Sequence, residues 1–457
     1  MKLFAYQDKN SFSERFERFK KVATKEQLYA FLFDLPKGGD IHNHLDGSTS
    51  PEWWFKVATD QTLNGGKKFF TRTQNLKCQD NNEPFLAYKN LRESSYNQLS
   101  DCGKSECEPI STLSEEHKRN WLSSLRLDTP DKGCDEFFEC IFPRLLDLRQ
   151  DLELLTESLV ENMRQLGAEG VRYLETIMNP FRFQDVNGNL INSETVASHF
   201  RQRLSQPDAL ATGVTVRFQL FVMRFAPDAE QQIEDAYAFV AAHRDLWVGV
   251  NLVGREDNEQ GQPLRFLNTF RKLRRTYSGI QLSIHAGESA EPNSYVRDTL
   301  LLGATRIGHG INLISDPETM LLMRNSQYLV EINLISNRLL KYVPDLNFHP
   351  FPEYLRLGIP VCLNTDDRGI WDSNMTDEYY TAVTHFNLSW DEIIQLGHNS
   401  LEYSFVESDV KAKLMAEYQA DIAKFEQKYL AEDWLEKLED VTPVSSGYSE
   451  KNFGINI

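Results

Sequence analysis

Short apolar runs recur along most of the chain, and amphipathic stretches separate them. Most runs are shorter than a typical helix and rich in β-branched or large apolar residues, which favours buried β-strands. The first run ends at Ile41, and the others span 170–177, 214–225, 246–254, 280–288, 306–313, 328–336 and 359–367. The pattern predicts eight strands.

The stretches between these runs show helical periodicity. Four precede the second to fifth strands, at 152–170, 193–205, 228–246 and 262–279, and shorter ones span 294–303, 317–326 and 351–358. Several end on glycine, as helix C-termini prefer. Strands that alternate with helices pair in parallel, and eight such units predict an α/β fold, a closed (β/α)8 TIM barrel. A doubly wound open sheet is the alternative, but no GxGxxG motif follows the first strand.

Other segments lie outside this series. Residues 11–35 predict one or two N-terminal helices, and the chain from Asp367 to about 440 predicts C-terminal helices followed by a loose tail from about 441. Residues 60–133 are rich in Asn, Lys, Ser and Asp and predict a long insertion after strand 1. We therefore expect a single barrel domain over 1–457 that carries an insertion or lid at 60–133.

Composition narrows the partners. The chain has 41% hydrophobic and 25% charged residues, which are typical of a globular protein, and a formal net charge of −18. Nucleic-acid-binding proteins carry basic faces, so the charge favours a small-molecule partner over a nucleic acid. No apolar run is long enough to span a membrane and the first residues lack a secretory pattern, so we expect no membrane partner and a cytoplasmic location.

The distribution of cysteines suggests an alternative cellular location. Five of the six cysteines fall between Cys78 and Cys140, and no CxxC pair occurs among them. A disulfide in this segment requires an oxidising compartment, so a periplasmic or secreted location is the alternative.

Polar residues with metal-binding or acid–base chemistry gather where the predicted strands end. They are His42 and His44 after strand 1, His285 after strand 5, His309 at strand 6, and Asp366 and Asp367 after strand 8. In a (β/α)8 barrel these ends open onto one face, where such enzymes keep their active sites. The six side chains are therefore expected to converge.

The spacing of His42 and His44 suits a metal ion. Residues two apart in an extended chain point to the same side, so both imidazoles can bind one ion, with His285 and Asp366 completing the set. Three imidazoles and one carboxylate suit zinc, which lowers the pKa of a bound water to about 7. Each motif alone also fits a surface turn or helix start, and His309 fits a structural loop residue; their joint placement favours a metal-dependent hydrolase.

The remaining histidines lie in helical or loop stretches and are interpreted as structural. They are His117, His199, His243, His349, His385 and His398.

The same motifs, in order, resemble those of a known family. "PKGGDIHNHLDGS", "GVRYLE", "VGVNLVGRE", "IHAGE", "RIGHGI" and "LNTDD" are similar to the adenosine deaminase family of metal-dependent amidohydrolase barrels, over roughly 30–440. The resemblance implies one zinc ion held by His42, His44, His285 and Asp366. The implied reaction is hydrolytic deamination of adenosine or 2'-deoxyadenosine to the inosine product and ammonia.

The resemblance also implies roles for individual residues. Glu288 would protonate purine N1, and His309 would orient the attacking oxygen. In substrate binding, Asp367 would contact purine N7 and the backbone of Gly254 would contact N3. His44 and Asp46 would contact the ribose. Cytidine-type zinc deaminases need HxE and PCxxC motifs, which the chain lacks. Two-metal amidohydrolases need a lysine at the end of strand 4, where this chain has "NLVGRE".

Departures from the family pattern leave the substrate open. Arg368 replaces the usual proline after the aspartate pair, which could alter the loop beside the purine. The insertion is longer than the usual lid; its interpretations are a surface insertion, an enlarged lid or an oligomer contact such as a homodimer interface. "EINLISNRLLKYVPDLNFHP" resembles the secreted growth-factor branch of the family, which carries insertions and a disulfide.

Alternative substrates are adenine, adenosine monophosphate and an N6-modified nucleoside, and a non-catalytic nucleoside-binding barrel is a further alternative. No cluster of Arg or Lys follows the barrel motifs in sequence, which weakly disfavours a phosphate-bearing substrate.

Overall fold

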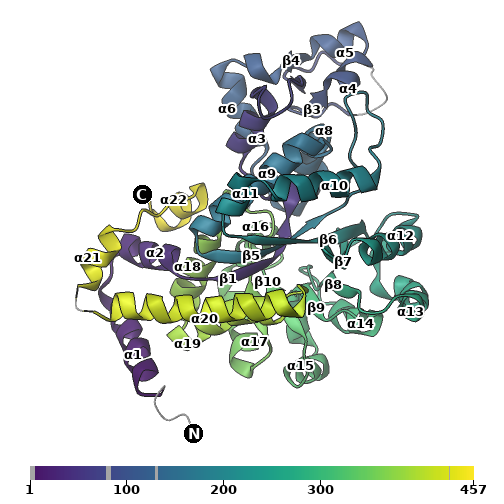
Figure 1. Cartoon of the computed structure of the whole chain (residues 1–457). Helices are drawn as coiled ribbons and strands as arrows, with labels where there is room; N and C mark the ends of the chain where they lie inside the picture. The colour runs from purple at the N-terminus through teal and green to yellow at the C-terminus, as the bar shows by residue number, and fades with distance from the viewer. Residues whose placement is uncertain (1–5, 79–83, 129–131, 432) are drawn as a thin grey trace.

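A computed structural model describes residues 6–78, 84–128, 132–431 and 433–457 of the chain (Figure 1). Eight parallel strands form one sheet in the order β1-β5-β6-β7-β8-β9-β10-β11. They are β1 (Gly38–His44), β5 (Val171–Met178), β6 (Thr215–Met223), β7 (Trp247–Val253), β8 (Gln281–Ala286), β9 (Arg306–His309), β10 (Leu329–Ile332) and β11 (Val361–Leu363). All eight predicted strands are confirmed.

The sheet closes between its first and last strands. Asn43 and Asp366 form a parallel bridge. His44 N–H donates to the Asp366 carbonyl at 3.0 Å, and Asp366 N–H donates to the His42 carbonyl at 3.0 Å. The predicted (β/α)8 barrel is therefore confirmed, and its closure joins the HxH motif directly to the aspartate pair.

Helices connect the strands as the periodicity predicts. They include α9 (Leu152–Ala168), α10 (Ser193–Leu204), α12 (Ala229–Ala242), α13 (Leu267–Thr276), α14 (Tyr295–Leu302), α15 (Pro317–Arg324) and α17 (Phe351–Leu357). Helix α16 (Leu334–Leu339) was not predicted and begins inside the run 328–336 that was predicted as a strand. Gly303 and Gly358 end α14 and α17 with φ of 96° and 81°, a left-handed backbone that glycine adopts without steric cost.

Terminal helices pack together beside the barrel (Figure 1). They are α1 (Tyr6–Val22), α2 (Lys25–Asp34), α18 (Met375–Phe386), α19 (Trp390–Glu402), α20 (Ser408–Leu430) and α21 (Trp434–Glu439). Aromatic rings join them: the centroids of Phe12 and Trp390 lie 4.6 Å apart, and those of Phe31 and Phe425 lie 4.8 Å apart. These contacts fix both ends of the chain to one apolar cluster.

The prediction of a loose C-terminal tail is wrong. Residues Gly447–Phe453 form helix α22, and the side chains of Tyr448 and Ile455 are buried. Tyr448 N–H donates to the Asp372 carbonyl at 2.8 Å, so the tail is fixed to the loop after β11. Its polar composition concealed these two apolar contacts.

The insertion has a small sheet of its own, which lies away from the terminal helices in Figure 1. It follows α3 (Pro51–Thr59) and contains the antiparallel strands β2 (Phe69–Arg72), β3 (Asn90–Arg92) and β4 (Cys107–Pro109), in the order β3-β2-β4, with helices α4 (Glu93–Asn97), α5 (Asp101–Ser105) and α6 (Glu115–Ser124). Asn90 Nδ2 donates to the Arg144 carbonyl at 2.8 Å, which ties the insertion to helix α8 (Phe142–Arg149).

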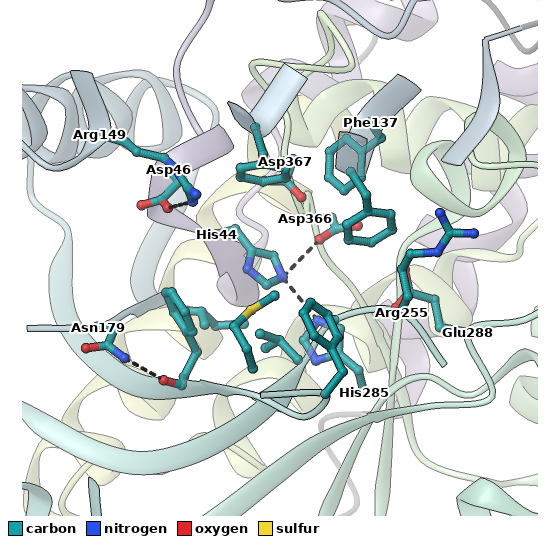
Figure 2. Close-up of a pocket in the computed structure, with 18 of the residues that line it drawn as sticks. His44, Asp46, Phe137, Arg149, Asn179, Arg255, His285, Glu288, Asp366 and Asp367 are labelled. Carbon is teal, nitrogen blue, oxygen red and sulfur yellow. Dashed lines mark hydrogen bonds and ion pairs between the residues drawn. The ribbon is translucent and has the colours of Figure 1, made fainter. Parts of the chain in front are cut away.

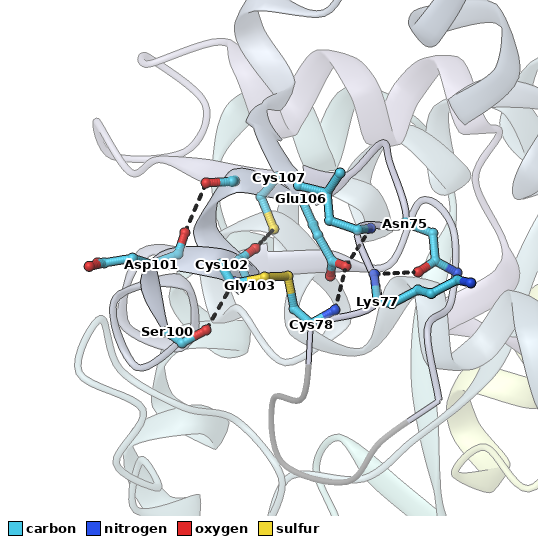
Figure 3. Close-up of a disulfide and its surroundings, with 11 residues drawn as sticks. Asn75, Lys77, Cys78, Ser100, Asp101, Cys102, Gly103, Glu106 and Cys107 are labelled. Atoms are coloured by element: carbon cyan, nitrogen blue, oxygen red, sulfur yellow. Dashed lines mark hydrogen bonds between the residues drawn. A yellow bond between two sulfur atoms is a disulfide. The ribbon is translucent and has the colours of Figure 1, made fainter.

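A disulfide joins Cys78 to Cys102 within the insertion (Figure 3). Glu106 accepts hydrogen bonds from the backbone N–H groups of Leu76 at 2.9 Å and Cys78 at 3.4 Å, so the segment around the disulfide is held to the start of β4. Within the described parts of the chain, no helix combines the length and apolar character that a membrane crossing requires.

Candidate active site

A cavity of about 460 Å³ opens at the carboxyl ends of the barrel strands (Figure 2). Apolar and aromatic side chains form much of its wall, and every residue predicted for the site except the fully buried His42 lines it. The apolar lining includes Phe137, Phe138, Phe142, Leu146, Ile177, Phe221, Met223, Phe225 and Val253. A largely apolar hollow with a few polar groups at its base is typical of small-molecule sites.

Hydrogen bonds fix the ring of His42 in one tautomer. Its Nδ1 lies 2.6 Å from Glu331 Oε2, an acceptor, so Nδ1 carries a proton and Nε2 is the atom that can bind a cation in place of its own proton. Burial alone would raise the pKa of Glu331, but the Arg306 guanidinium and His42 outweigh it and lower the pKa to about 2. The pKa of His42 is raised to about 10, because Asp366 and Glu331 outweigh burial. The carboxylates that favour a proton there would favour a metal cation equally.

His285 is oriented in the same way by a chain of amides. Gln219 Nε2 donates to the Ile41 carbonyl, so Gln219 Oε1 accepts from Asn251 Nδ2 at 2.9 Å. Asn251 Oδ1 then faces His285 Nδ1 at 3.0 Å, which places the proton on Nδ1 and the lone pair on Nε2. Burial lowers the pKa of His285 well below its usual value, so the ring is neutral, as metal binding requires.

His44 and Asp366 meet these rings at one point. His44 Nε2 lies 3.1 Å from His285 Nε2 and 3.4 Å from Asp366 Oδ1, and His42 Nε2 lies 3.6 Å from the same oxygen. Zn–N and Zn–O bonds of 2.0–2.2 Å in a tetrahedron separate ligands by about 3.3 Å. Burial lowers the pKa of His44 to about 4. The spacing and the neutral rings of His44 and His285 therefore fit one tetrahedral ion.

Two further observations favour a cation here. His42 Nε2 is buried and has no hydrogen-bond partner among the described residues, which is costly unless another group binds it. Asp366 has a φ of 55°, an uncommon conformation for a non-glycine residue, and Ser336 Oγ donates to its Oδ2 at 2.5 Å while Oδ1 faces the imidazoles. Two groups of side chains have ligand atoms close enough together to hold a metal ion. One is His42, His44 and Asp366, and the other is His42, His285 and His309.

The tautomer of His309 argues against its being a ligand. Phe351 N–H donates to His349 Nδ1 at 3.1 Å, so His349 Nε2–H donates to Asn337 Oδ1 at 3.0 Å. Asn337 Nδ2 therefore donates to His309 Nδ1 at 2.8 Å, which leaves the proton on His309 Nε2. This N–H points toward Glu288, whose Oε1 lies 3.6 Å away. His309 is thus a neutral donor inside the cavity.

Glu288 is held in place as a neutral acid. Its backbone N–H and that of Gly287 donate to Glu256 at 3.0 and 3.1 Å, which fixes the turn after β8. Burial, with the nearby charges of Asp366 and Glu256, raises the pKa of Glu288 well above its usual value. A carboxyl group that keeps its proton at neutral pH can donate it to a bound base.

Asp367, which also lines the cavity, is a second carboxyl group with a raised pKa. Burial and the charges of Asp366 and Asp46 raise its pKa well above the usual value, and its Oδ1 has no hydrogen-bond partner within the described structure.

Gly254 lies at the end of β7 with φ of 100°, and a Cβ there would meet Phe225 at 2.8 Å. A side chain at position 254 would therefore disturb the cavity wall.

The carboxylate of Asp46, which was predicted to contact the ribose, is already bound by two arginines. Arg149 Nη1 donates to its Oδ2 at 2.9 Å, and the Arg182 guanidinium binds both of its oxygens. Both arginines line the cavity. The absence of an arginine cluster, inferred from the linear sequence, is therefore wrong for the folded chain, because helix α8 and the turn after β5 bring these two together.

Arg368 does not reach the cavity. Its Nη2 donates to Glu169 Oε1 at 2.6 Å, and its side chain is buried behind the aspartate pair. Glu169 also accepts from the Thr376 backbone N–H at 2.8 Å, so Arg368 helps to join the loop after β11 to the end of α9 and the start of α18. Arg368 is not among the residues that line the cavity, and its effect on the loop beside the purine stays a prediction.

The family model "Adenosine deaminase" matches residues 124–420, well over half of the sequence. The chain belongs to the adenosine deaminase family. An adenosine deaminase of Vibrio cholerae is 35% identical over 192 residues, which are 42% of this chain and 55% of that protein, so the chain spans about half the length of this relative. The N6-methyl-AMP deaminase-L of Xenopus laevis is 28% identical over 288 residues, 62% of this chain and 78% of that protein.

A solved structure shares the fold. An amidohydrolase from Burkholderia ambifaria, crystallised with bound Zn, is 19% identical, with a TM-score of 0.64 over 92% of this chain and 96% of that one. At this identity the likeness shows the barrel alone.

The residues that orient the predicted site of this deaminase-family chain were not predicted from its sequence. Glu331, Asn251 and Glu256 lie at or just after strand ends, but their partners are 31 to 289 positions away. His349, interpreted as structural, acts on His309 through Asn337. Only "GRE", directly after β7, carried a local signal, a charged pair at the end of a barrel strand.

Proposed function

We propose that this chain is a zinc-dependent deaminase that hydrolyses adenosine and 2'-deoxyadenosine to inosine, 2'-deoxyinosine and ammonia. The observation that carries the proposal is the pairing of two features in one cavity. Three imidazoles and an aspartate converge at its base, and a carboxyl group that retains its proton stands beside them.

One zinc ion would be held by His42, His44 and His285 through Nε2 and by Asp366 through Oδ1. When bound, it supplies a Lewis acid that lowers the pKa of water to about 7. Glu331, Asn251 and Ser336 set the direction of three of these ligands. Such outer partners are typical of functional metal sites.

The remaining side chains act on the purine. Glu288 donates its proton to N1, which makes C6 electrophilic, and His309 Nε2–H donates to the oxygen that adds at C6. The water supplies the oxygen and two protons: one returns to the Glu288 carboxylate and the other moves to N6, so that the C6–N6 bond breaks, ammonia leaves and the C6 carbonyl forms. Asp367, protonated, donates to N7, because N7 can only accept. The Gly254 backbone meets N3, and His44 and Asp46 lie on the ribose side.

Other aminopurines are the second candidates. Adenine, adenosine monophosphate and an N6-modified nucleoside present the same C6 to the same groups, and a related protein carries the name N6-methyl-AMP deaminase. A non-catalytic nucleoside-binding barrel would dispense with the proton on Glu288 or with a metal ligand, and this chain retains both sets of residues. The partner on either account is a small purine compound, and a homodimer stays a prediction.

The test combines metal analysis with turnover. Purified protein is assayed for zinc by mass spectrometry and for deamination by ultraviolet absorbance with adenosine, 2'-deoxyadenosine, adenine, adenosine monophosphate and N6-methyladenosine. We expect one zinc per chain and turnover of adenosine or 2'-deoxyadenosine that chelation abolishes and zinc restores. Protein with zinc but no turnover of any of these compounds would contradict the proposal.

A further inference from the structure

We propose that the sugar side of the cavity binds a phosphate, so that the site accepts purine nucleoside 5'-monophosphates. The inference rests on the proposed deamination and concerns the substrate class of that site. It starts from the two arginines, Arg149 and Arg182, that flank Asp46.

The arginine pair stands across the barrel from the acid. Arg182 follows β5 and Asp46 follows β1, which are neighbours in the sheet, whereas Glu288 follows β8, the fifth strand of eight counted from β1. Figure 2 shows Arg149 and Asp46 on one side of His44 and Glu288 on the other. N1 and the sugar-bearing N9 lie on opposite sides of a purine. A ring with N1 at Glu288 therefore directs its sugar toward Arg149.

The charged side chains on the sugar side of the cavity carry a net positive charge. Arg149 and Arg182 contribute two positive charges and Asp46 one negative charge, and these side chains are between 6% and 20% exposed. One arginine would neutralise Asp46, so the pair leaves one cationic charge in a mostly apolar cavity. A neutral sugar hydroxyl does not compensate that charge, whereas a phosphate does.

Donors also remain for a ligand. Two guanidinium groups carry about ten N–H bonds; Asp46 accepts three of them, and the Arg149 carbonyl accepts one more from Arg182 Nη2 at 3.4 Å. Arg149 Nε and Arg182 Nε are buried and find no hydrogen-bond partner within the described chain. The guanidinium carbon of Arg149 lies 5.1 Å from the Phe142 ring centroid and that of Arg182 lies 5.4 Å from the Phe221 centroid. The donors are thus preorganised on two aromatic walls, which suits bidentate binding of phosphate.

The test compares adenosine and adenosine 5'-monophosphate on the zinc-loaded protein. We expect kcat/KM for the monophosphate to equal or exceed that for adenosine. In Arg149→Met the ratio of these two values should fall by at least tenfold, and Arg149→Lys should recover part of it. Asp46→Asn, which removes the competing carboxylate, should raise the ratio. Arg164→Met, on the exposed face of α9, is the matched control and should leave the ratio unchanged.

Two results would overturn the inference: a wild-type preference of more than tenfold for adenosine, or an unchanged ratio in Arg149→Met. The pair would then serve only to orient Asp46. If neither compound is deaminated, the proposed function fails by itself, and calorimetric binding of inosine 5'-monophosphate against inosine decides the phosphate site. Tighter binding of the monophosphate, lost in Arg149→Met, would support it, and equal binding would refute it.

Discussion

At the scale of single residues, the site depends on which atom of each side chain holds a proton. His42 and His285 each hold a proton on Nδ1 and turn Nε2 toward a common point, whereas His309 carries its proton on Nε2. Three imidazoles of identical chemistry thus divide into two candidate ligands and a donor through the hydrogen bonds behind them. Glu288 completes the set as an acid that burial keeps protonated.

The first prediction concerns Glu288. Glu288→Gln removes the proton donor but preserves volume and burial, so we expect kcat to fall by a factor of about 100 or more while zinc content is unchanged. In the wild type, kcat should decline as pH rises through the raised pKa of Glu288, because only its protonated form donates. Near wild-type kcat in the amide variant would contradict the N1 role.

His349 provides a second prediction, at a position outside the cavity. His349→Leu removes the donor that orients Asn337, so the amide can turn and the His309 tautomer is no longer fixed. We expect kcat to fall roughly tenfold with little change in KM, and His349→Gln, whose amide can replace the Nε2–H donor, to restore most of it. Equal kcat in all three proteins would show that this chain of hydrogen bonds has no role.

At the scale of elements, the barrel strands support one another's functional residues. Glu331 on β10 accepts from Arg306 on β9 at 2.7 Å and from Ser283 on β8 at 3.0 Å while it holds His42 on β1. Arg306 also pairs with Glu175 on β5 at 2.8 Å. A charged network therefore crosses the barrel interior below the site, and every member has a partner, as buried charges require.

This network predicts the effect of Glu331→Gln. The amide is a weaker acceptor than the carboxylate and holds His42 less firmly, so we expect zinc affinity to fall by about 10- to 100-fold. Competition with a chelator of known affinity measures the change. Glu353→Gln, on the exposed side of α17, is the control. Unaltered affinity in Glu331→Gln, with the thermal stability of the metal-free protein preserved, would exclude the orienting role.

Much of the fold and of the candidate site could be predicted from short stretches of the sequence. The eight strands followed from runs of apolar residues, and His42, His44, His285 and Asp366 from their positions at strand ends, because both signals lie within a few residues. Arg149 and Arg182 could not be connected to Asp46, since they are 103 and 136 positions away in the sequence. The C-terminal helix was missed for a related reason: Tyr448 and Ile455 are apolar positions whose burial depends on the rest of the fold.

At the scale of the whole molecule, the barrel carries a separate structural unit in the insertion. The described parts of 60–133 form a three-stranded sheet that the Cys78–Cys102 disulfide connects to α5. Disulfides persist in oxidising compartments, so this pair fits the periplasmic or secreted alternative, and the compartment itself stays a prediction. That the chain forms a single domain stays a prediction.

The disulfide gives a prediction for the insertion. Its closed loop has a sequence separation of 24, for which chain entropy predicts about 3 kcal/mol of stabilisation. The variant Cys78→Ser/Cys102→Ser should therefore be cleaved faster by protease within the insertion, and reduced wild-type protein should behave alike. If the cleavage rates of oxidised, reduced and variant proteins coincide, the bond does not stabilise this segment.

The central claim is that Asp366 holds a catalytic zinc ion and that Asp367, its neighbour, binds the purine. The most direct measurement is zinc content, determined together with deamination, in Asp366→Ala and Asp367→Ala. We expect Asp366→Ala to lose zinc and turnover together, because it removes the ligand oxygen, and Asp367→Ala to keep one zinc per chain with turnover reduced at least tenfold. Equal zinc loss in both variants, or full zinc content in Asp366→Ala, would contradict the account.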